Sequence, residues 1–592
     1  MKMKKITLAY ALLVIVFLPL GQNLAVAQKP LYGGTLTVGW PRDTISFNGV
    51  VDYWMASARA DIQIYNKLIM QTPGYGWKGD LAQSWEIAPD GKAVTFNLYR
   101  NVTWHDGKKF TSADVKWHYE QILTYKPPTY SFPRFSGVLD KIETPDDYTV
   151  VFRLKKWSWG AFEGFGYGNA DNFILPKHIY EGTDLKTNPA NWKPIGTGPF
   201  KMTEYVKDSH FIVEANEAYF KGRPYLDKVI FKIIPSAPTA LIALEKKEVQ
   251  LNMISPPPGE MTRLKTVPNL KLLLLPASTG SCRITFNNRP EGLKAHPWLN
   301  DIRVKQAIAY ALDTKTLASK ILLDQVAEAR GPLGAGMTYW LKPAINEVYA
   351  YNVAKAEALL DDAGYKKGPD GIRIRVKMPS YGGQPYQDAA EFVRAELRKV
   401  GIDVEVILVE SGTFMTMYEA NPEGMRDYAM VLNNMGAGPD PERNRLNYLT
   451  ANAPPNGTNF GFYSNKRVDE LLNAGSEERS MEKRRELYYE FQDIIMKELP
   501  IIGLFSSRMV VTYWDEYAGV ENYWEYTYSP ISPVWWTKGR PLTTTAATVA
   551  TRTTTTPIPT TAPSFDPTMV IALVVIVVGI GLFWRLRKTR KT

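Results

Sequence analysis

Stretches in which apolar and polar residues alternate mark the strands of this chain. Residues 34–39, 94–98 and 149–154 alternate in this way and are rich in β-branched and aromatic side chains, which favours strands with one buried face. Between the first two stretches, residues 57–70 place apolar side chains at the spacing of a helix. Strands and helices mixed along the chain, without a short repeat, predict an α/β or α+β protein.

The segment from Trp104 to Glu120 brings two of the five histidines, His105 and His118, close to acidic residues. The sequence His105-Asp106-Gly107 predicts a tight turn, and the hydroxyl of Thr111 with Asp114 three residues later predicts a helix start. The two histidines therefore fall on different elements, and no third ligand stands at metal-binding spacing. We interpret the segment as a turn and a capped helix, with no metal or cofactor. The buried face of this helix would carry Val115, Tyr119 and Ile122.

Helix signals are clearest in the second half of the chain. Asn352 can cap a helix that runs to Ala363, where Gly364 supplies the stop. Similarly, Asp301 or Asn300 can cap a helix that starts a few residues later. Both helices are predicted to be structural.

The start of the chain has the order of a secretory signal peptide. At 592 residues the chain is too long for one ordinary core, so we expect two or more lobes behind this leader. Three lysines precede an apolar run at 6–20, and Ala25-Val26-Ala27 supplies small residues before Gln28. We predict cleavage after Ala27, giving a leader at 1–27. A retained membrane helix is the alternative, which the short apolar run disfavours.

A second apolar run, 569–584, lies near the other end and is followed by five Lys and Arg residues. Because basic flanks stay in the cytoplasm, we predict a transmembrane anchor at 568–585 and a cytoplasmic tail at 586–592, with everything before them at the cell surface. The Thr/Pro-rich segment 541–567 cannot bury enough apolar surface to fold. It is predicted to be an extended stalk.

The formal net charge of +10 suggests nucleic-acid binding, but the distribution of the charge along the chain does not. The leader holds three positive charges and the tail five, which leaves +2 for all other residues. Such a body lacks the clustered basic footprint that phosphate-backbone binding needs, so we expect no nucleic-acid partner. Cys282 is the only cysteine, so no disulfide can form within the chain and no cysteine after the leader can carry a lipid.

The order of motifs over the external part of the chain resembles one family, the solute-binding proteins of peptide, opine and nickel type (family 5) that serve ABC importers. Each motif is weak alone, and their number in one order carries the resemblance. The motifs are Leu81-Ala82-Gln83-Ser84-Trp85, Pro89-Asp90-Gly91, Thr95-Phe96-Asn97-Leu98, Trp104-His105-Asp106-Gly107, Gly196-Thr197-Gly198-Pro199-Phe200, Asn216-Glu217-Ala218-Tyr219-Phe220, Arg223-Pro224-Tyr225-Leu226-Asp227, Asp301-Ile302-Arg303-Val304 and Ala358-Leu359-Leu360-Asp361-Asp362-Ala363-Gly364.

The resemblance implies an α/β fold of the periplasmic-binding-protein type (class II, large type), with two hinged lobes and an extra domain inserted in the first. It places the first lobe at 28–280 and 508–540, the inserted domain at about 65–190, and the second lobe at 281–507. His105 and Asp106 would then be scaffold residues of the inserted domain. A C-terminal transmembrane helix added to this fold resembles the arrangement of archaeal members.

The resemblance also implies a function, capture of an oligopeptide or similar small oligomer between the lobes and its delivery to a permease. Lobe closure on the ligand is the signal, separate permease and ATPase chains are the partners, and no bond is made or broken. An oligosaccharide-binding receptor of the same fold is one alternative. A surface-tethered hydrolase is another, because spacing in sequence leaves open a pair of catalytic carboxylates, although no phosphate loop, nucleophile elbow or zinc-protease pattern is present.

The ligand residues are predicted from the same resemblance and from side-chain chemistry. Peptide-binding members hold the ligand amino terminus with an aspartate a few residues before an acid-Pro pair, a position that Ala437 fills here unless a small shift makes Asp440 the partner. A buried ammonium without a carboxylate is costly, which weakens the peptide assignment and favours sugars that stack on aromatic rings and bind amides. The predicted ligand-binding residues are Tyr53, Trp54, Asn434, Asp440, Asn459, Trp535 and Trp536.

Overall fold

The computed structural model describes residues 29–44, 46–52, 55–72, 76–125, 131–166, 170–414, 428–436, 438, 440–454, 457–522 and 530–539. All of them belong to one of the two structural units of the chain, residues 1–541. The predicted leader, stalk, anchor and tail lie outside the described residues. Within the described ranges, no helix has both the length and the apolar character needed to cross a bilayer.

The first lobe is built on a mixed sheet around the first strand. β1 pairs in parallel with β10 along its whole length and with β11 on its other side, and β9 and β8 continue antiparallel from β10. Leu36 and Val38 alternate along β1 and are fully buried, as the sequence pattern predicts. The elements are β1 (Thr35–Trp40), β8 (Phe200–Val206), β9 (His210–Ala215), β10 (Lys228–Ile233), β11 (Leu251–Asn252), α1 (Met55–Ile64), α6 (Ala237–Glu245) and α7 (Met261–Leu264).

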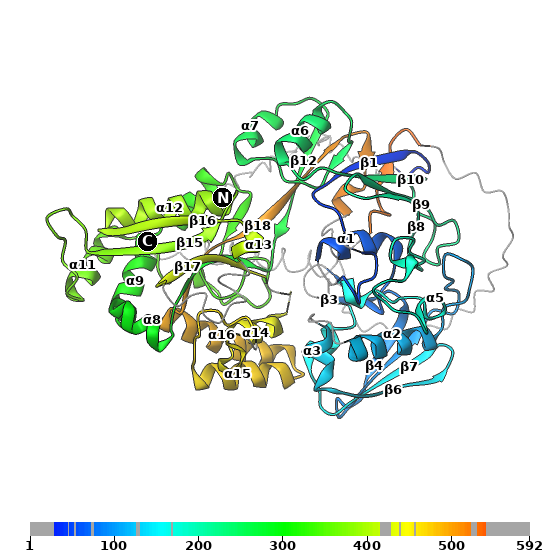
Figure 1. Ribbon diagram of the computed structural model, residues 1–592, viewed down its shortest axis with the longest axis horizontal. Coiled ribbons are helices and arrows are strands. Elements are labelled where there is room, and N and C mark those ends of the chain that lie inside the picture. Colours follow the sequence, from blue (N-terminus) through cyan, green and yellow to red (C-terminus); the bar gives the residue numbers. More distant parts are fainter. Residues whose placement is uncertain are drawn as a thin grey trace, which may run out of the picture. The chain divides into compact units, whose positions relative to one another are not determined.

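A four-stranded antiparallel sheet in the order β4-β5-β7-β6 forms the core of an inserted subdomain, which interrupts the first lobe in sequence. The helix α2 lies along this sheet (Figure 1), and its Val115, Tyr119 and Ile122 are fully buried, which confirms the predicted inner face. The elements are β4 (Ala82–Ile87), β5 (Ala93–Leu98), β6 (Leu139–Asp146), β7 (Thr149–Leu154), α2 (Ser112–Tyr125), α3 (Ser131–Ser136), α4 (Trp159–Glu163) and α5 (Lys177–Tyr180).

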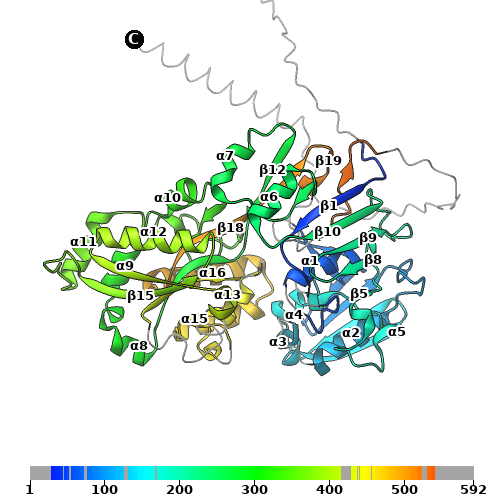
Figure 2. The same ribbon diagram turned by 45° about the horizontal axis from the view of Figure 1, so that its top comes forward.

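The second lobe has its own sheet, in the order β16-β15-β17-β13. The helix α12 lies along β15 and β16 (Figure 2), and apolar side chains from these strands, α9 and α12 form one core. A second core joins α14, α15 and α16. The elements are β13 (Ser281–Phe286), β14 (Val326–Glu328), β15 (Ile374–Tyr381), β16 (Ile402–Val409), β17 (Met430–Met435), α8 (Pro290–Ala295), α9 (Ile302–Ala311), α10 (Thr314–Thr316), α11 (Val353–Asp362), α12 (Tyr386–Lys399), α13 (Ser411–Phe414), η8 (Pro441–Arg443), α14 (Asn444–Tyr448), α15 (Lys466–Glu477) and α16 (Met481–Glu498).

One long strand, β18 (Ile501–Trp514), belongs to both lobes. Its residues 501–505 pair with β13 of the second lobe, and residues 508–514 pair with β12 (Leu270–Ala277) of the first lobe. β11 of the first lobe also pairs with the later part of β18. The backbone therefore passes between the lobes as one continuous strand.

Two short antiparallel pairs complete the described strands. The residues of β2 (Ile69–Thr72) pair with β3 (Gly76–Gly79), and β19 (Tyr517–Ala518) pairs with β20 (Trp535–Trp536). The predicted helix at 57–70 is therefore too long, since α1 ends at Ile64. Its last residues form β2 because the backbone around Lys67 and Leu68 bonds to the segment that begins at Asp80, a contact that helical spacing cannot reveal.

The predicted caps are confirmed at both helices of the second lobe. Asn352 accepts the N–H of Lys355 at 2.9 Å and starts α11, and Gly364 follows the helix with φ of +88°. Of the two candidates for the earlier helix, Asp301 is the cap of α9 and accepts the N–H of Arg303 at 2.9 Å. Local chemistry thus sets these boundaries.

Candidate functional site

The three predicted polar ligand residues, Asn434, Asp440 and Asn459, all belong to the second lobe. Asn434 lies on β17 opposite Cys282 of β13, and its side chain is half-buried. The next residue back, Asn433, is fully buried, and its Oδ1 accepts a hydrogen bond from Thr285 Oγ1 at 2.8 Å. Asn434 is the member of the predicted polar set that keeps part of its side chain exposed.

Asp440 is fully buried, and both of its carboxylate oxygens are engaged within the chain. Arg484 on α16 donates from Nη1 to Oδ2 and from Nη2 to Oδ1, both at 2.7 Å. Oδ1 also accepts the N–H of Glu442 at 2.8 Å, which caps η8. A ligand ammonium would have to compete with Arg484, so this geometry favours a structural role for Asp440, and its ligand contact stays a prediction.

Arg484 is as deeply buried as Asp440, and its guanidinium contacts a backbone carbonyl and three aromatic rings in addition to that carboxylate. Its Nε donates to the carbonyl oxygen of Gly475 at 2.7 Å. Burial works against its charge, but the Asp440 carboxylate, together with Tyr488 and Glu442, outweighs burial and raises the pKa of Arg484 above its ordinary value. Aromatic rings lie 4.5, 4.9 and 5.6 Å from its guanidinium carbon, those of Trp159, Trp340 and Tyr488.

Asn459 has a structural environment as well. Its side chain is only 2% exposed, and Nδ2 donates to the carbonyl oxygens of Leu449 and Tyr463 at 3.0 and 2.8 Å. Its Oδ1 accepts the N–H of Tyr463 at 3.1 Å. The amide therefore ties two loop segments together, and its predicted contact with a ligand would require it to exchange these bonds.

Only two of the four predicted aromatic residues, Trp535 and Trp536, lie within the described residues. Trp535 is buried and Trp536 half-buried on β20, where the Trp536 ring covers Gly34 so closely that a Cβ there would lie 2.8 Å from Cε3. These two rings pack on the first lobe beside β19. Tyr53 and Trp54 lie outside the described residues, as does Ala437.

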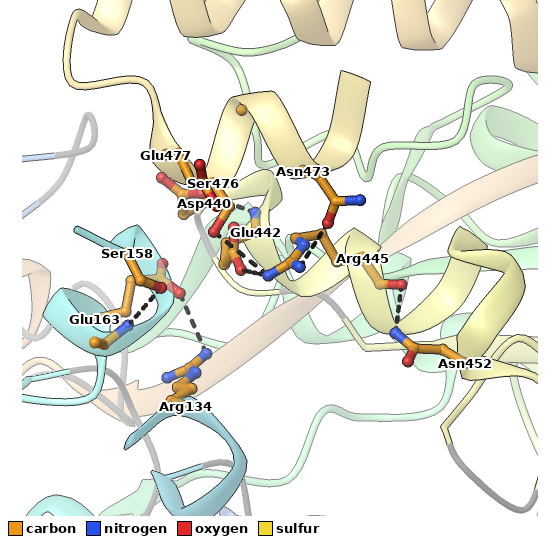
Figure 3. Close-up of polar contacts among 12 residues, drawn as sticks. Arg134, Ser158, Glu163, Asp440, Glu442, Arg445, Asn452, Asn473, Ser476 and Glu477 are labelled. Carbon is orange, nitrogen blue, oxygen red and sulfur yellow. Dashed lines mark hydrogen bonds and ion pairs between the residues drawn. The ribbon is translucent and has the colours of Figure 1, made fainter. Parts of the chain in front are cut away.

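Two carboxylates that sequence reasoning missed, Glu163 and Glu442, are buried close to Asp440 (Figure 3). Arg134 donates to Glu163 Oε2 at 3.2 Å, and Arg445 donates to Glu442 Oε1 at 2.8 Å. Burial raises the pKa of Glu163 to about 7, against the opposing effect of Arg134, and burial also raises the pKa of Glu442. The remaining oxygens, Glu163 Oε1 and Glu442 Oε2, are buried without a hydrogen-bond partner among the described residues.

Little in the sequence signals this cluster. Glu442 follows the Asp440-Pro441 pair, so a second acid at that turn was visible. Glu163 lies on α4 of the inserted subdomain and Arg484 on α16, and no periodicity links positions so far apart. Only the folded chain brings these charges together.

Two histidines of the inserted subdomain, His105 and His118, and the single cysteine have structural environments. His105 Nε2 lies 3.1 Å from the carbonyl oxygen of Gly198, and His118 Nε2 lies 3.0 Å from that of Asp171. Burial lowers the pKa of both histidines to about 4 and raises the pKa of the Cys282 thiol. Across the described ranges, no group of three or more His, Cys, Asp and Glu side chains is arranged to hold a metal ion.

Comparison with known proteins identifies the family to which the chain belongs. The family model described as "Bacterial extracellular solute-binding proteins, family 5 Middle" matches residues 76–457. The chain belongs to this family. Family 5 proteins bind solutes, and the match extends through the inserted subdomain and most of the second lobe.

Relatives within family 5 cover most of the chain. The oligopeptide-binding protein AppA of Bacillus subtilis is 30% identical over 493 residues, which are 80% of this chain and 85% of AppA. The dipeptide-binding protein of Escherichia coli is 26% identical over 450 residues, 72% of this chain and 81% of that protein. Among solved structures, the ABC transporter substrate-binding protein CtaP of Listeria monocytogenes has a TM-score of 0.75 at 25% identity, covering 86% of this chain and all of CtaP. The two-lobed α/β fold of family 5 is thus shared.

Proposed function

We propose that this chain is the extracellular solute-binding receptor of an ABC importer, which captures an oligopeptide or similar small oligomer between its lobes and passes it to a permease. Membership of family 5 carries this proposal, supported by similarity to an oligopeptide-binding and a dipeptide-binding protein over most of the chain. The lobes act by closing on the ligand, so the ligand needs only to contact both lobes better in the closed state. No chemical step is involved.

The partner change of β18 supports the lobe boundaries that we propose. We place the first lobe at 28–280 and 508–540 and the second at 281–507, because β18 leaves β13 after residue 505 and joins β12 at residue 508. The leader, stalk and anchor predicted at 1–27, 541–567 and 568–585 complete the proposal. They would hold the receptor at the outer face of the cytoplasmic membrane, where separate permease and ATPase chains can reach it.

An oligosaccharide is the second candidate ligand. It is favoured by Ala437 at the position of the aspartate that peptide-binding members use, and by the engagement of the nearby Asp440 with Arg484. Neither side chain offers an open carboxylate for a ligand ammonium. A surface-tethered hydrolase has less support, because the family is one of solute-binding proteins.

A thermal-shift panel separates these ligand classes. The purified full-length chain is heated with short peptides or with short oligosaccharides, and a true ligand raises the melting temperature by mass action. A rise with peptides supports the oligopeptide receptor, and a rise with oligosaccharides alone refutes it in favour of the second candidate. Mass spectrometry of the recovered ligand tests for hydrolysis, which would contradict the receptor role.

A further inference from the structure

The inserted subdomain touches the second lobe directly, away from the strands that connect the lobes. Trp159 Nε1 donates to the carbonyl oxygen of Glu478 at 2.6 Å, and Lys156 Nζ lies 2.5 Å from Glu477 Oε1. In the opposite direction, Arg479 Nη1 donates to the carbonyl oxygen of Pro89 at 2.5 Å. These contacts join positions that are 319 to 390 residues apart in sequence, so they form only when the two parts meet.

Two cations of the second lobe also lie over aromatic rings of the inserted subdomain. The guanidinium carbon of the buried Arg484 is 4.5 Å from the centroid of the Trp159 ring, and that of Arg479 is 5.9 Å from Trp157. The two tryptophan rings are 5.3 Å apart and meet edge to face. A desolvated cation over an indole is a favourable contact, so Trp159 makes both a hydrogen bond and a cation–π contact across the boundary.

Local structure holds each side of this contact in place. Ser158 caps α4 by accepting the N–H of Ala161 at 3.3 Å, which fixes the direction of Trp159. On the other side, Glu478 and Ser480 lie in the tight turn between α15 and α16, where Ser480 caps α16. The approach is close, because a Cβ added at Gly160 would lie 3.2 Å from Glu442 Oε1. Both surfaces are therefore preorganised.

The two sides belong to different packed bodies. Trp157 and the half-buried Trp159 pack in the core that the inserted subdomain shares with β1, β8, β9 and β10. Behind Arg484, the rings of Trp340 and Tyr488 pack in the core of α14, α15 and α16. Since the lobes are connected through strands such as β18, motion at that hinge would make or break the contact as a unit.

We propose that the contact between α4 and the α15–α16 turn is a latch that stabilises the closed form of the receptor, with Trp159 as its principal residue. The latch rests on the proposed function, because it matters only if the lobes open and close. It assigns to the inserted subdomain a role in stabilising closure. Any interaction present only in the closed state shifts the equilibrium towards that state and so tightens ligand binding.

The residues of the latch should contribute unequally to the stability of the closed form. Lys156 and Glu477 are 62% and 54% exposed, so their ion pair contributes little. Trp159 should contribute most, and its replacement by alanine should lower the closed-to-open ratio by roughly tenfold or more. Arg479 makes one hydrogen bond at an exposed position, and Arg479→Ala should lower the ratio by roughly threefold.

Crosslinking measures the latch without any ligand. Lys156→Cys and Glu477→Cys replace the weak ion pair in the full-length chain, and a short bismaleimide joins the two thiols only while the lobes are closed. Cys282 is fully buried and does not compete for the reagent. The initial rate of crosslinking is then compared after adding Trp159→Ala, Arg479→Ala or the control Trp192→Ala, a ring 41% exposed that stacks on Tyr205 of the first lobe.

The latch predicts a rate about tenfold lower with Trp159→Ala, about threefold lower with Arg479→Ala and unchanged with Trp192→Ala. Absence of any crosslink in the parent, or rates unaffected by both latch substitutions, would overturn the proposal. Arg479→Ala removes an exposed side chain, so it decides the matter even if Trp159→Ala disturbs folding, which circular dichroism checks. Adding a mixture of short peptides tests the proposed function separately. If Trp159→Ala lowers the crosslinking rate but peptides do not change the rate of the parent, the latch is supported and a peptide ligand is refuted.

Discussion

The buried pair of Asp440 and Arg484 offers a test of which carboxylates are structural. Asp440→Asn removes one negative charge and leaves the shape of the side chain almost unchanged. An asparagine Oδ1 can still accept the N–H of Glu442, so the cap of η8 survives. The perturbation therefore isolates the charge that faces Arg484.

The expected loss follows from the burial of the pair. Both side chains have no exposed surface, and two hydrogen bonds of 2.7 Å join them. Removing one partner leaves a buried guanidinium without its hydrogen-bonded counter-charge, which typically costs about 3–5 kcal/mol of folding free energy. The rings of Trp340 and Tyr488 soften this loss only in part, because a cation–π contact is worth about 2 kcal/mol when desolvated.

Urea unfolding followed by tryptophan fluorescence measures the change, with Trp340 as a reporter inside the affected core. The matched control is the double variant Asp440→Leu with Arg484→Met, which replaces the pair by apolar side chains of similar volume and should recover most of the stability. A loss below about 1 kcal/mol for Asp440→Asn would refute the reasoning. A double variant as unstable as the single one would show that packing, and not charge, was the cause.

Three further predictions concern single residues. Asn352→Ala should lower the free energy of unfolding by about 1 kcal/mol without changing ligand affinity, because it removes only the cap of α11. Burial lowers the pKa of His118 to about 4 from the usual 6.5, so the unfolded chain binds more protons between these values. Its contribution to stability, up to about 3 kcal/mol, is complete above pH 6.5 and lost as pH falls towards 4, and His118→Gln should flatten that dependence in urea unfolding at several pH values. Asn434→Ala should weaken binding of the ligand found by thermal shift by roughly two- to tenfold in calorimetry, and unchanged affinity would remove Asn434 from the site.

Short residue patterns are enough to predict several local elements and the family. Alternation along 34–39 and 149–154 predicted β1 and β7, and the side chains of Asn352 and Asp301 predicted the starts of α11 and α9. These features depend on a few neighbouring residues, whose hydrogen bonds and buried faces are set within one or two turns of chain. The order of motifs predicted the family 5 fold, which the comparisons confirm.

Which polar groups pair with one another depends on the complete fold. The fold pairs Asp440, whose contact with a ligand stays a prediction, with Arg484, 44 positions away. It also brings Glu163 of the inserted subdomain near Glu442 of the second lobe. Contacts with the segment that begins at Asp80 likewise explain why the end of the predicted helix at 57–70 is the strand β2. Electrostatic pairing and burial depend on distance in space, and these distances between residues far apart in sequence are set only when the chain folds.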